Sequence, residues 1–126
     1  MDDYVSEYKA DEEIESYAKL EGPTMKHFLT KLVVYMGRES NSINPDNEDE
    51  QICFIGDSQK ISRRHAKISW NKERCNWEII ILSKNKAIIN GASLRKDDPP
   101  LPLPPFSSIK IDKFKFYFFP AVQRNE

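Results

Sequence analysis

The stretch Lys-Ile-Ser-Arg-Arg-His-Ala-Lys-Ile-Ser-Trp, residues 60–70, places a dense polar cluster directly before a short alternating segment. The alternating half has apolar residues at every second position, which is typical of a β-strand with one buried face. The cluster supplies a hydroxyl, two guanidinium groups, an ammonium and an imidazole. Because loops at strand ends are where a rigid scaffold presents binding groups, the stretch predicts a strand that begins at a ligand-binding loop.

Other strand-length apolar runs, rich in β-branched and aromatic residues, lie on both sides of this stretch. The gaps between them carry Asn, Asp, Gly, Pro or Ser, which favour turns. No segment has a sustained 3.6-residue apolar stripe, so the pattern predicts an all-β sandwich of two antiparallel sheets. The clearest runs are Leu29–Met36, Ile52–Ile55, His65–Trp70, Trp77–Leu82, Ala87–Ile89, Ile109–Ile111 and Phe114–Phe119.

The length of 126 residues suits one domain that can form a core without disulfides or a metal. The two cysteines, Cys53 and Cys75, are too few for a disulfide scaffold and form no Cys-x-x-Cys pair. No apolar run approaches the ~18 residues of a membrane span. The N-terminus is acidic, whereas a signal or transit peptide would be basic. We therefore expect an intracellular protein with no membrane partner.

Charge is distributed unevenly along the chain. Residues 1–21 carry a net charge of −6 and residues 22–57 a net charge of −3, whereas residues 58–126 carry a net charge of +8. The basic half indicates an anionic ligand, unless it is only a solvated surface of mixed sign. One hypothesis is that the acidic N-terminus folds back over the basic loops as an intramolecular mask.

Composition divides the chain into a flexible acidic arm at residues 1–15, a domain at residues 16–122 and a tail at residues 123–126. Within the domain, residues 39–50 are polar and acidic and are expected to form a mobile surface loop. Residues 97–105 hold five of the eight prolines. They predict a rigid connector between two strands, with an SH3 or WW ligand as the less favoured alternative.

Two further polar groups follow strand-length runs. Gly37-Arg38 ends one run, and Gly37 is expected to allow a tight or positive-φ turn. Ser83–Lys86 lies between two runs, where Asn85 could adopt the left-handed region and still offer its amide. An arginine fork matches phosphate or carboxylate, and each charge-assisted bond contributes about 1.5–3 kcal/mol. These groups carry the donors that an anionic oxygen cluster would need.

At these places the sequence resembles the forkhead-associated (FHA) domain, a phosphothreonine-binding β-sandwich. The family pattern is Gly-Arg after an early strand, Ser-x-x-His some 20–30 residues later, and an Asn-Gly turn about 20 residues after that. The similarity covers roughly residues 16–120, and residues 16–22, 61–68 and the proline segment look most like FHA domains of forkhead-type transcription factors. The matching residues here are Gly37-Arg38, Ser62-Arg63-Arg64-His65, and Asn85-Lys86 followed by Asn90-Gly91.

The resemblance implies an eleven-stranded sandwich whose loops hold a phosphopeptide. Arg38 would contact the phosphate, and Ser62 would donate its hydroxyl to a phosphate oxygen. Asn85 would hold the peptide main chain. Arg63 and Lys84 occupy positions that in the family often reach the phosphate or the peptide.

The remaining carried-over roles concern selectivity and support. Lys60, two residues before the serine, would favour an acidic residue at the third position after the phosphothreonine. Gly37, His65 and Asn90 would be structural. One departure from the family is that Lys86 replaces the glycine of an Asn-Gly turn at Asn85. If that position needs positive φ, Lys86 would be strained by ~1 kcal/mol or more.

The resemblance therefore implies a phosphothreonine-peptide binding module that recruits a phosphorylated protein partner. It suggests a nuclear setting, in transcription regulation or DNA-damage signalling, with DNA approached only through a larger assembly. Two alternatives stay open, a phosphate-independent scaffold of the same fold and a nucleic-acid binder that uses the basic half. No enzyme is expected, because Ser62 and His65 lack an acidic orienter and a Gly-x-Ser-x-Gly elbow. No metal or cofactor is expected, and the oligomeric state is left open.

Overall fold

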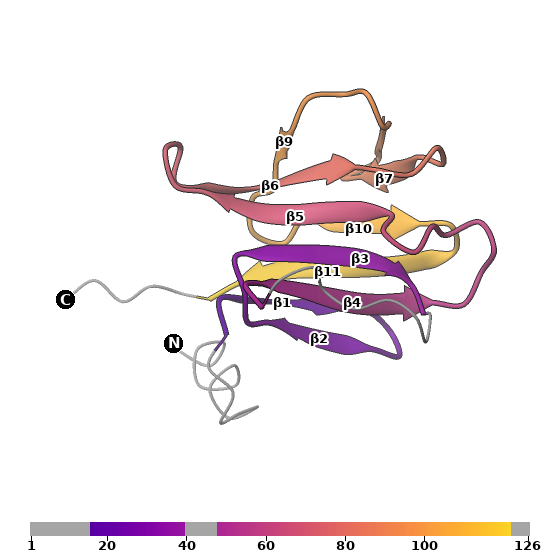
Figure 1. Ribbon diagram of the computed structural model, residues 1–126, viewed down its shortest axis with the longest axis horizontal. Helices are drawn as coiled ribbons and strands as arrows, with labels where there is room; N and C mark the ends of the chain where they lie inside the picture. Colours follow the sequence, from indigo (N-terminus) through magenta and orange to yellow (C-terminus); the bar gives the residue numbers. More distant parts are fainter. Residues whose placement is uncertain (1–15, 40–47, 122–126) are drawn as a thin grey trace.

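The computed structural model describes residues 16–39 and 48–121, which form two packed β-sheets (Figure 1). One sheet has six strands in the order β2-β1-β11-β10-β7-β8, and the other has five in the order β4-β3-β5-β6-β9. The predicted all-β sandwich and its eleven strands are confirmed. The strands are β1 (Ala18–Glu21), β2 (Lys26–Leu29), β3 (Val33–Arg38), β4 (Glu50–Gly56), β5 (Ala66–Asn71), β6 (Asn76–Ile81), β7 (Ala87–Ile89), β8 (Ala92–Leu94), β9 (Leu101–Pro102), β10 (Ser108–Ile111) and β11 (Phe114–Pro120).

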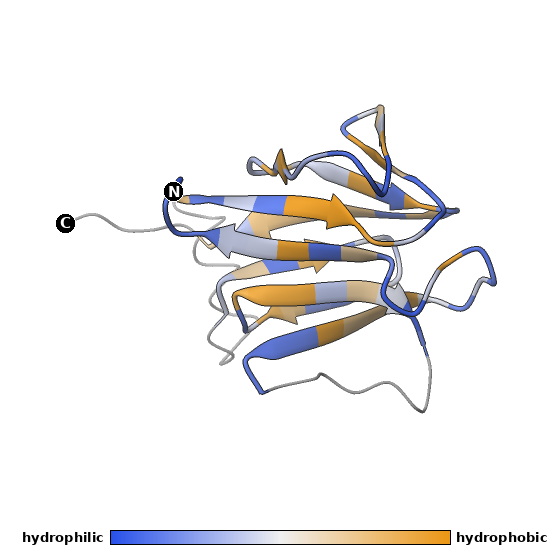
Figure 2. Cartoon of the chain, turned by 45° about the horizontal axis from the view of Figure 1, so that its top comes forward, coloured by the Kyte–Doolittle hydropathy of each residue, from blue (hydrophilic) through white to orange (hydrophobic). Residues whose placement is uncertain are grey.

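The core lies between the two sheets, because alternate residues of the central strands point inward. In β3 and β5, for example, Val34, Met36, Ala66 and Ile68 are fully buried. Figure 2 shows hydrophobic and hydrophilic segments following one another along the strands, whereas the connecting loops are mostly hydrophilic. Each large aliphatic or aromatic side chain buried in this way stabilises the fold by roughly 1.5–3 kcal/mol relative to exposure.

Strand β4 runs parallel to β3, so the five-stranded sheet is mixed rather than wholly antiparallel. Parallel neighbours need a long crossover connection, and the eleven residues between β3 and β4 provide one. The middle of this connection, residues 40–47, lies outside the described residues. The expected acidic arm at 1–15 and the tail at 123–126 also lie outside them.

Two strand predictions need correction. The run Leu29–Met36 is not one strand, because residues 30–32 separate β2 from β3. The proline segment is not only a connector, since Leu101–Pro102 forms β9 and pairs with β6. It can do so because β9 is an edge strand, where proline's missing donor leaves no partner unsatisfied.

No helix among the described residues is long and apolar enough to cross a membrane.

Candidate functional site

The three polar groups meet at one end of the five-stranded sheet. Strands β3, β5 and β6 are neighbours, with Met36 opposite Ala66 and Ala66 opposite Ile81. Because β5 is antiparallel to both neighbours, the end of β3, the start of β5 and the end of β6 lie at the same end of the sheet. The loops at residues 57–65 and 82–86 therefore lie beside Arg38, on the right in Figure 1. We call Arg38 together with the loops at residues 57–65 and 82–86 the loop cluster.

Arg38 is half-buried and held in place by the loop before β5. Its Nε donates to the carbonyl of Ile61 at 2.9 Å, and its backbone N donates to the carbonyl of Ser62 at 3.0 Å. Its two terminal guanidinium nitrogens make no hydrogen bond with the described residues. The side chain is thus oriented through Nε while its planar end stays available for an anion.

Gly37 is required by close packing rather than by its backbone angles. A Cβ built at this position would lie 1.7 Å from the carbonyl oxygen of Arg63, so any side chain would displace the loop. The expectation of a tight or positive-φ turn at Gly37 is wrong, because Gly37 lies within β3 and, among the described residues, Gly91 is the glycine with positive φ. The absence of a Cβ is what lets the loop lie against β3.

Ser62 faces the neighbouring loop. Its Oγ lies 2.7 Å from Oγ of Ser83, a buried residue at the start of the β6–β7 loop. Ser83 Oγ also accepts the backbone N–H of Asn85 at 3.0 Å. A hydroxyl has one proton and two acceptor lone pairs, so Ser83 can donate to Ser62 and leave the Ser62 proton for a ligand.

His65 is buried within the loop cluster and contacts all three of its chain segments. Its Nδ1 accepts the backbone N–H of Ser62 at 3.1 Å, so the proton resides on Nε2, which faces the carbonyl of Lys86 at 3.4 Å. Its backbone bonds to Met36 and to Leu82 as well. Burial lowers the pKa of His65 from its usual value, which keeps the ring neutral in this tautomer. Neither ring nitrogen is therefore placed to take a proton from Ser62 Oγ, as a nucleophile–base pair would require.

Asn85 joins the two loops. Its Nδ2 donates to the carbonyl of Lys60 at 2.9 Å, which leaves Oδ1 for a donor on a ligand. Neither Asn85 nor Lys86 is among the described residues with positive φ, so Asn85 does not adopt the left-handed region and the condition for strain at Lys86 is not met. The left-handed pair is Asn90 (φ 52°) and Gly91 (φ 87°), which form the β7–β8 turn.

Asn90 lies in that turn and not in the loop cluster. Its Oδ1 accepts the backbone N–H of Ser108 at 2.9 Å, and its Nδ2 donates to Oγ of Ser107 at 3.3 Å. These bonds fix the β7–β8 hairpin to the start of β10. The predicted supporting role of Asn90 would thus act on the hairpin rather than on a ligand.

Three more predicted residues, Lys60, Arg63 and Lys84, are exposed on the two loops. The backbone N of Lys60 is capped by Oγ of Ser58 at 3.1 Å. Arg64, next to Arg63, behaves differently, because its guanidinium carbon lies 4.5 Å from the ring centroid of Tyr35. Lys86 is exposed on the second loop as well, so the loop cluster presents four cations to solvent beside Arg38.

Sequence reasoning did not assign a role to Ser83 or to the Ile61 carbonyl, although both orient predicted ligand groups. The position of Ser83 two residues before Asn85 was a usable signal, because serine side chains often accept a backbone N–H two residues on. The Ile61 carbonyl had no signal in the residue type. Within residues 16–39 and 48–121, no group of His, Cys, Asp and Glu side chains could hold a metal ion.

Comparison with known proteins relates the chain to one family. The model of the FHA domain matches residues 34–112. Fork-head transcriptional regulator 2 of Candida albicans is 31% identical over 100 residues, which cover 76% of this chain and 15% of that protein. Transcriptional activator FHA1 of Nicotiana tabacum is 26% identical over 107 residues, which cover 85% of this chain and 50% of that protein. This chain therefore spans half or less of the length of these relatives.

Solved structures agree on the fold. The N-terminal FHA domain of S. cerevisiae Rad53p, in complex with a phosphothreonine peptide, aligns with a TM-score of 0.65 at 17% identity and covers 82% of this chain and 93% of that one. The expected likeness to forkhead-type transcription factors is confirmed by the Candida relative. Since the family model matches well over half of the residues, the chain belongs to the FHA domain family.

Proposed function

We propose that this domain binds a phosphothreonine-containing segment of a protein partner through the loop cluster. The observation that carries the proposal is the convergence of Arg38, Ser62 and Asn85 from three separate strand ends. Each of the three has one hydrogen bond that orients it and further polar atoms left for a ligand. A dianionic phosphate would meet donors that are already in position, which limits the ordering cost of binding.

The flanking cations extend the proposal to the peptide around the phosphate. Lys60, Arg63 and Lys84 are exposed on the loops of the cluster, and an acidic residue after the phosphothreonine would complement them. The finer setting that we propose is a nuclear complex in transcription regulation or DNA-damage signalling, and the name of the Candida fork-head transcriptional regulator supports the first of the two. We expect micromolar to sub-micromolar affinity, because one phosphate and few peptide contacts carry the binding.

The test is a titration by calorimetry with a degenerate phosphothreonine peptide library, repeated with phosphoserine and unphosphorylated libraries. Arg38→Ala is expected to weaken phosphothreonine binding at least about tenfold, since one charge-assisted bond to phosphate is worth roughly 1.5–3 kcal/mol. Arg74→Ala is the matched control, because it removes the same charge from the β5–β6 turn at the opposite end of the sheet. Equal binding of all three libraries would overturn the proposal and favour a phosphate-independent scaffold.

A further inference from the structure

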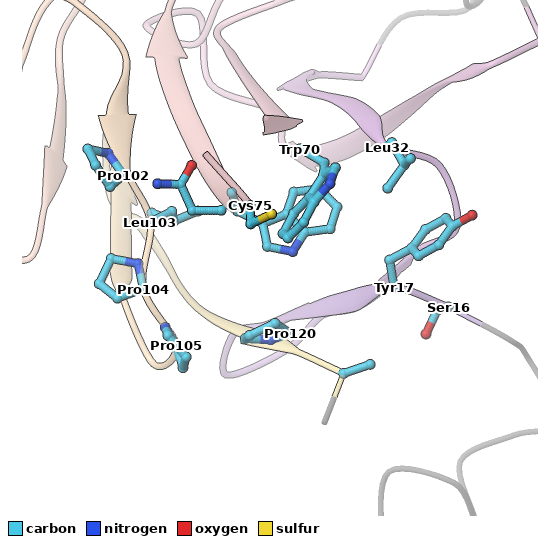
Figure 3. A pocket seen from close by; sticks show the side chains of 13 residues that line it. Ser16, Tyr17, Leu32, Trp70, Cys75, Pro102, Leu103, Pro104, Pro105 and Pro120 are labelled. Atoms are coloured by element: carbon cyan, nitrogen blue, oxygen red, sulfur yellow. The ribbon is translucent and has the colours of Figure 1, made fainter. Parts of the chain in front are cut away.

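An apolar groove lies at the end of the sandwich opposite the loop cluster. It has a volume of about 940 Å³ and is open to solvent (Figure 3). Pro102, Leu103 and Pro104 form one side, and Tyr17 and Leu32 form the other. Tyr17 directly precedes β1 and Leu32 directly precedes β3, whereas Pro102 ends β9 and is followed by Leu103 and Pro104.

The groove exposes large apolar side chains that a solvated surface would not favour. Tyr17 is 50% exposed, Leu32 40% and Trp70 36%. Trp70 packs edge-on against Trp77, with ring centroids 5.6 Å apart, so both indoles belong to the groove. The Oδ1 atom of Asn76, another lining residue, is buried without a hydrogen-bond partner. Contiguous exposed apolar surface of this kind marks an interaction site.

The chain itself supplies a candidate occupant. Ser16 lines the groove, and residues 1–15 join the domain directly at Ser16. A segment tethered at the edge of a site binds as an intramolecular ligand, at an effective concentration in the millimolar range. Residues 1–15 also carry apolar side chains among their acids, namely Tyr4, Val5, Tyr8 and Ile14.

Charge complementarity favours the same occupant. Residues 1–15 hold seven acidic residues and one lysine. The groove is flanked in sequence by Lys31, beside Leu32, and by Lys72 and Arg74, in the turn that ends at Cys75. Glu73 is the one acid in that turn.

We propose that residues 1–15 dock in this groove, with their tyrosines against Trp70 and their acids toward Lys72 and Arg74. This placement differs from a mask over the loop cluster, because the segment is attached at the opposite end of the sheet. It is independent of the proposed function, since no groove residue belongs to the loop cluster.

The test compares the full chain with the variant that carries Tyr4→Ser and Tyr8→Ser. The chain has only two tryptophans, and both line the groove, so its two indole N–H signals in a nitrogen-15 NMR spectrum report directly on occupancy. Both signals are expected to shift in the double variant. Tyr117→Ser is the matched control, because it removes an exposed tyrosine from β11 that does not line the groove.

Thiol reactivity gives a second readout. Cys75 lines the groove and is exposed, whereas Cys53 is buried and burial raises its pKa to about 12, so only Cys75 should react under native conditions. The rate of thiol modification at Cys75 is expected to be higher in the double variant. If only the undocked chain reacts, the factor of increase is one plus the ratio of docked to undocked molecules in the full chain. Unchanged indole signals and an unchanged rate would overturn the proposal. If the indole signals and the Cys75 rate of the full chain depend on protein concentration, the groove would instead be occupied by a second copy of the chain. If the double variant gains phosphopeptide affinity with no change in the indole signals or the Cys75 rate, residues 1–15 would instead bind the loop cluster.

Discussion

The hydroxyl oxygens of Ser62 and Ser83 lie 2.7 Å apart, so two loops from different strands share one hydrogen bond within the loop cluster. Ser83 is buried and also receives the backbone N–H of Asn85. It thereby couples the predicted phosphate donor Ser62 to the predicted main-chain clamp Asn85. The buried Ser83 thus positions both the hydroxyl of Ser62 and the backbone of Asn85.

Removing this coupling should weaken ligand binding while Ser62 and Asn85 remain present. We expect Ser83→Ala to reduce phosphopeptide affinity by up to about thirtyfold, because an intramolecular hydrogen bond contributes about 1 kcal/mol, the loop loses two of them, and about 1.4 kcal/mol corresponds to a factor of ten. Calorimetric titration measures the change. Ser93→Ala, on the exposed face of β8, is the matched control. Affinity of Ser83→Ala equal to that of the control would show that the loops hold their geometry without this hydroxyl.

The adjacent arginines Arg63 and Arg64 should behave differently although they carry the same charge. Arg63 is exposed on the loop, whereas Arg64 stacks on Tyr35. We expect Arg63→Ala to lower phosphopeptide affinity about threefold to tenfold, with a loss that shrinks at high salt because the contact is solvent-exposed. Arg64→Ala should change affinity little and lower the free energy of unfolding by about 0.5–1 kcal/mol through the lost stacking. Equal losses of affinity in both variants would mean that only net charge matters.

Much of the fold followed from local pattern. The alternation at residues 66–70 predicted β5, and the prediction of β7 at Ala87–Ile89 agrees with the structure residue for residue. The short edge strand β9 was missed, because two residues of a proline segment carry no periodicity. Pairing with β6 creates that strand, and pairing is a property of the folded sheet.

The candidate site was predictable where residue type alone limits the chemistry, as for Arg38 and Asn85. It was not predictable where backbone atoms do the positioning. The Ile61 carbonyl orients Arg38 and the Lys60 carbonyl receives Asn85, and any residue could supply either oxygen. The reason for Gly37 was misjudged in the same way, since the close approach of the Arg63 carbonyl depends on how the loop folds over β3.

Gly37→Ala should abolish phosphopeptide binding, because its Cβ would lie 1.7 Å from the Arg63 carbonyl oxygen and must push the loop away. Such overpacking typically lowers the free energy of unfolding by about 1–3 kcal/mol. Gly91→Ala is the matched control, because its Cβ meets no atom within 4 Å and it is strained only by its φ of +87° in the β7–β8 turn, outside the loop cluster. Urea unfolding should show both variants destabilised, and titration should show binding lost only in Gly37→Ala. Retained binding there would mean that the loop can shift without losing its ligand geometry.

Stability should fall in mildly acidic solution because His65 is held neutral. Burial lowers the pKa of His65 below its usual 6.5. Between the two pKa values, His65 is therefore protonated in the unfolded chain and neutral in the folded chain. The contribution of His65 to the free energy of unfolding is therefore constant above about pH 7 and decreases below about pH 6.5, by at most about 1.4 kcal/mol per pH unit. The pKa of His27 is also lowered by burial, so His27→Gln isolates the contribution of His65 in urea unfolding at several pH values.

Protonation of His65 would also remove the acceptor of the Ser62 backbone N–H, so the Ser62 amide signal in NMR should move with the same pH midpoint. An unfolding free energy of His27→Gln that is flat across this range would contradict the neutral, buried state of His65.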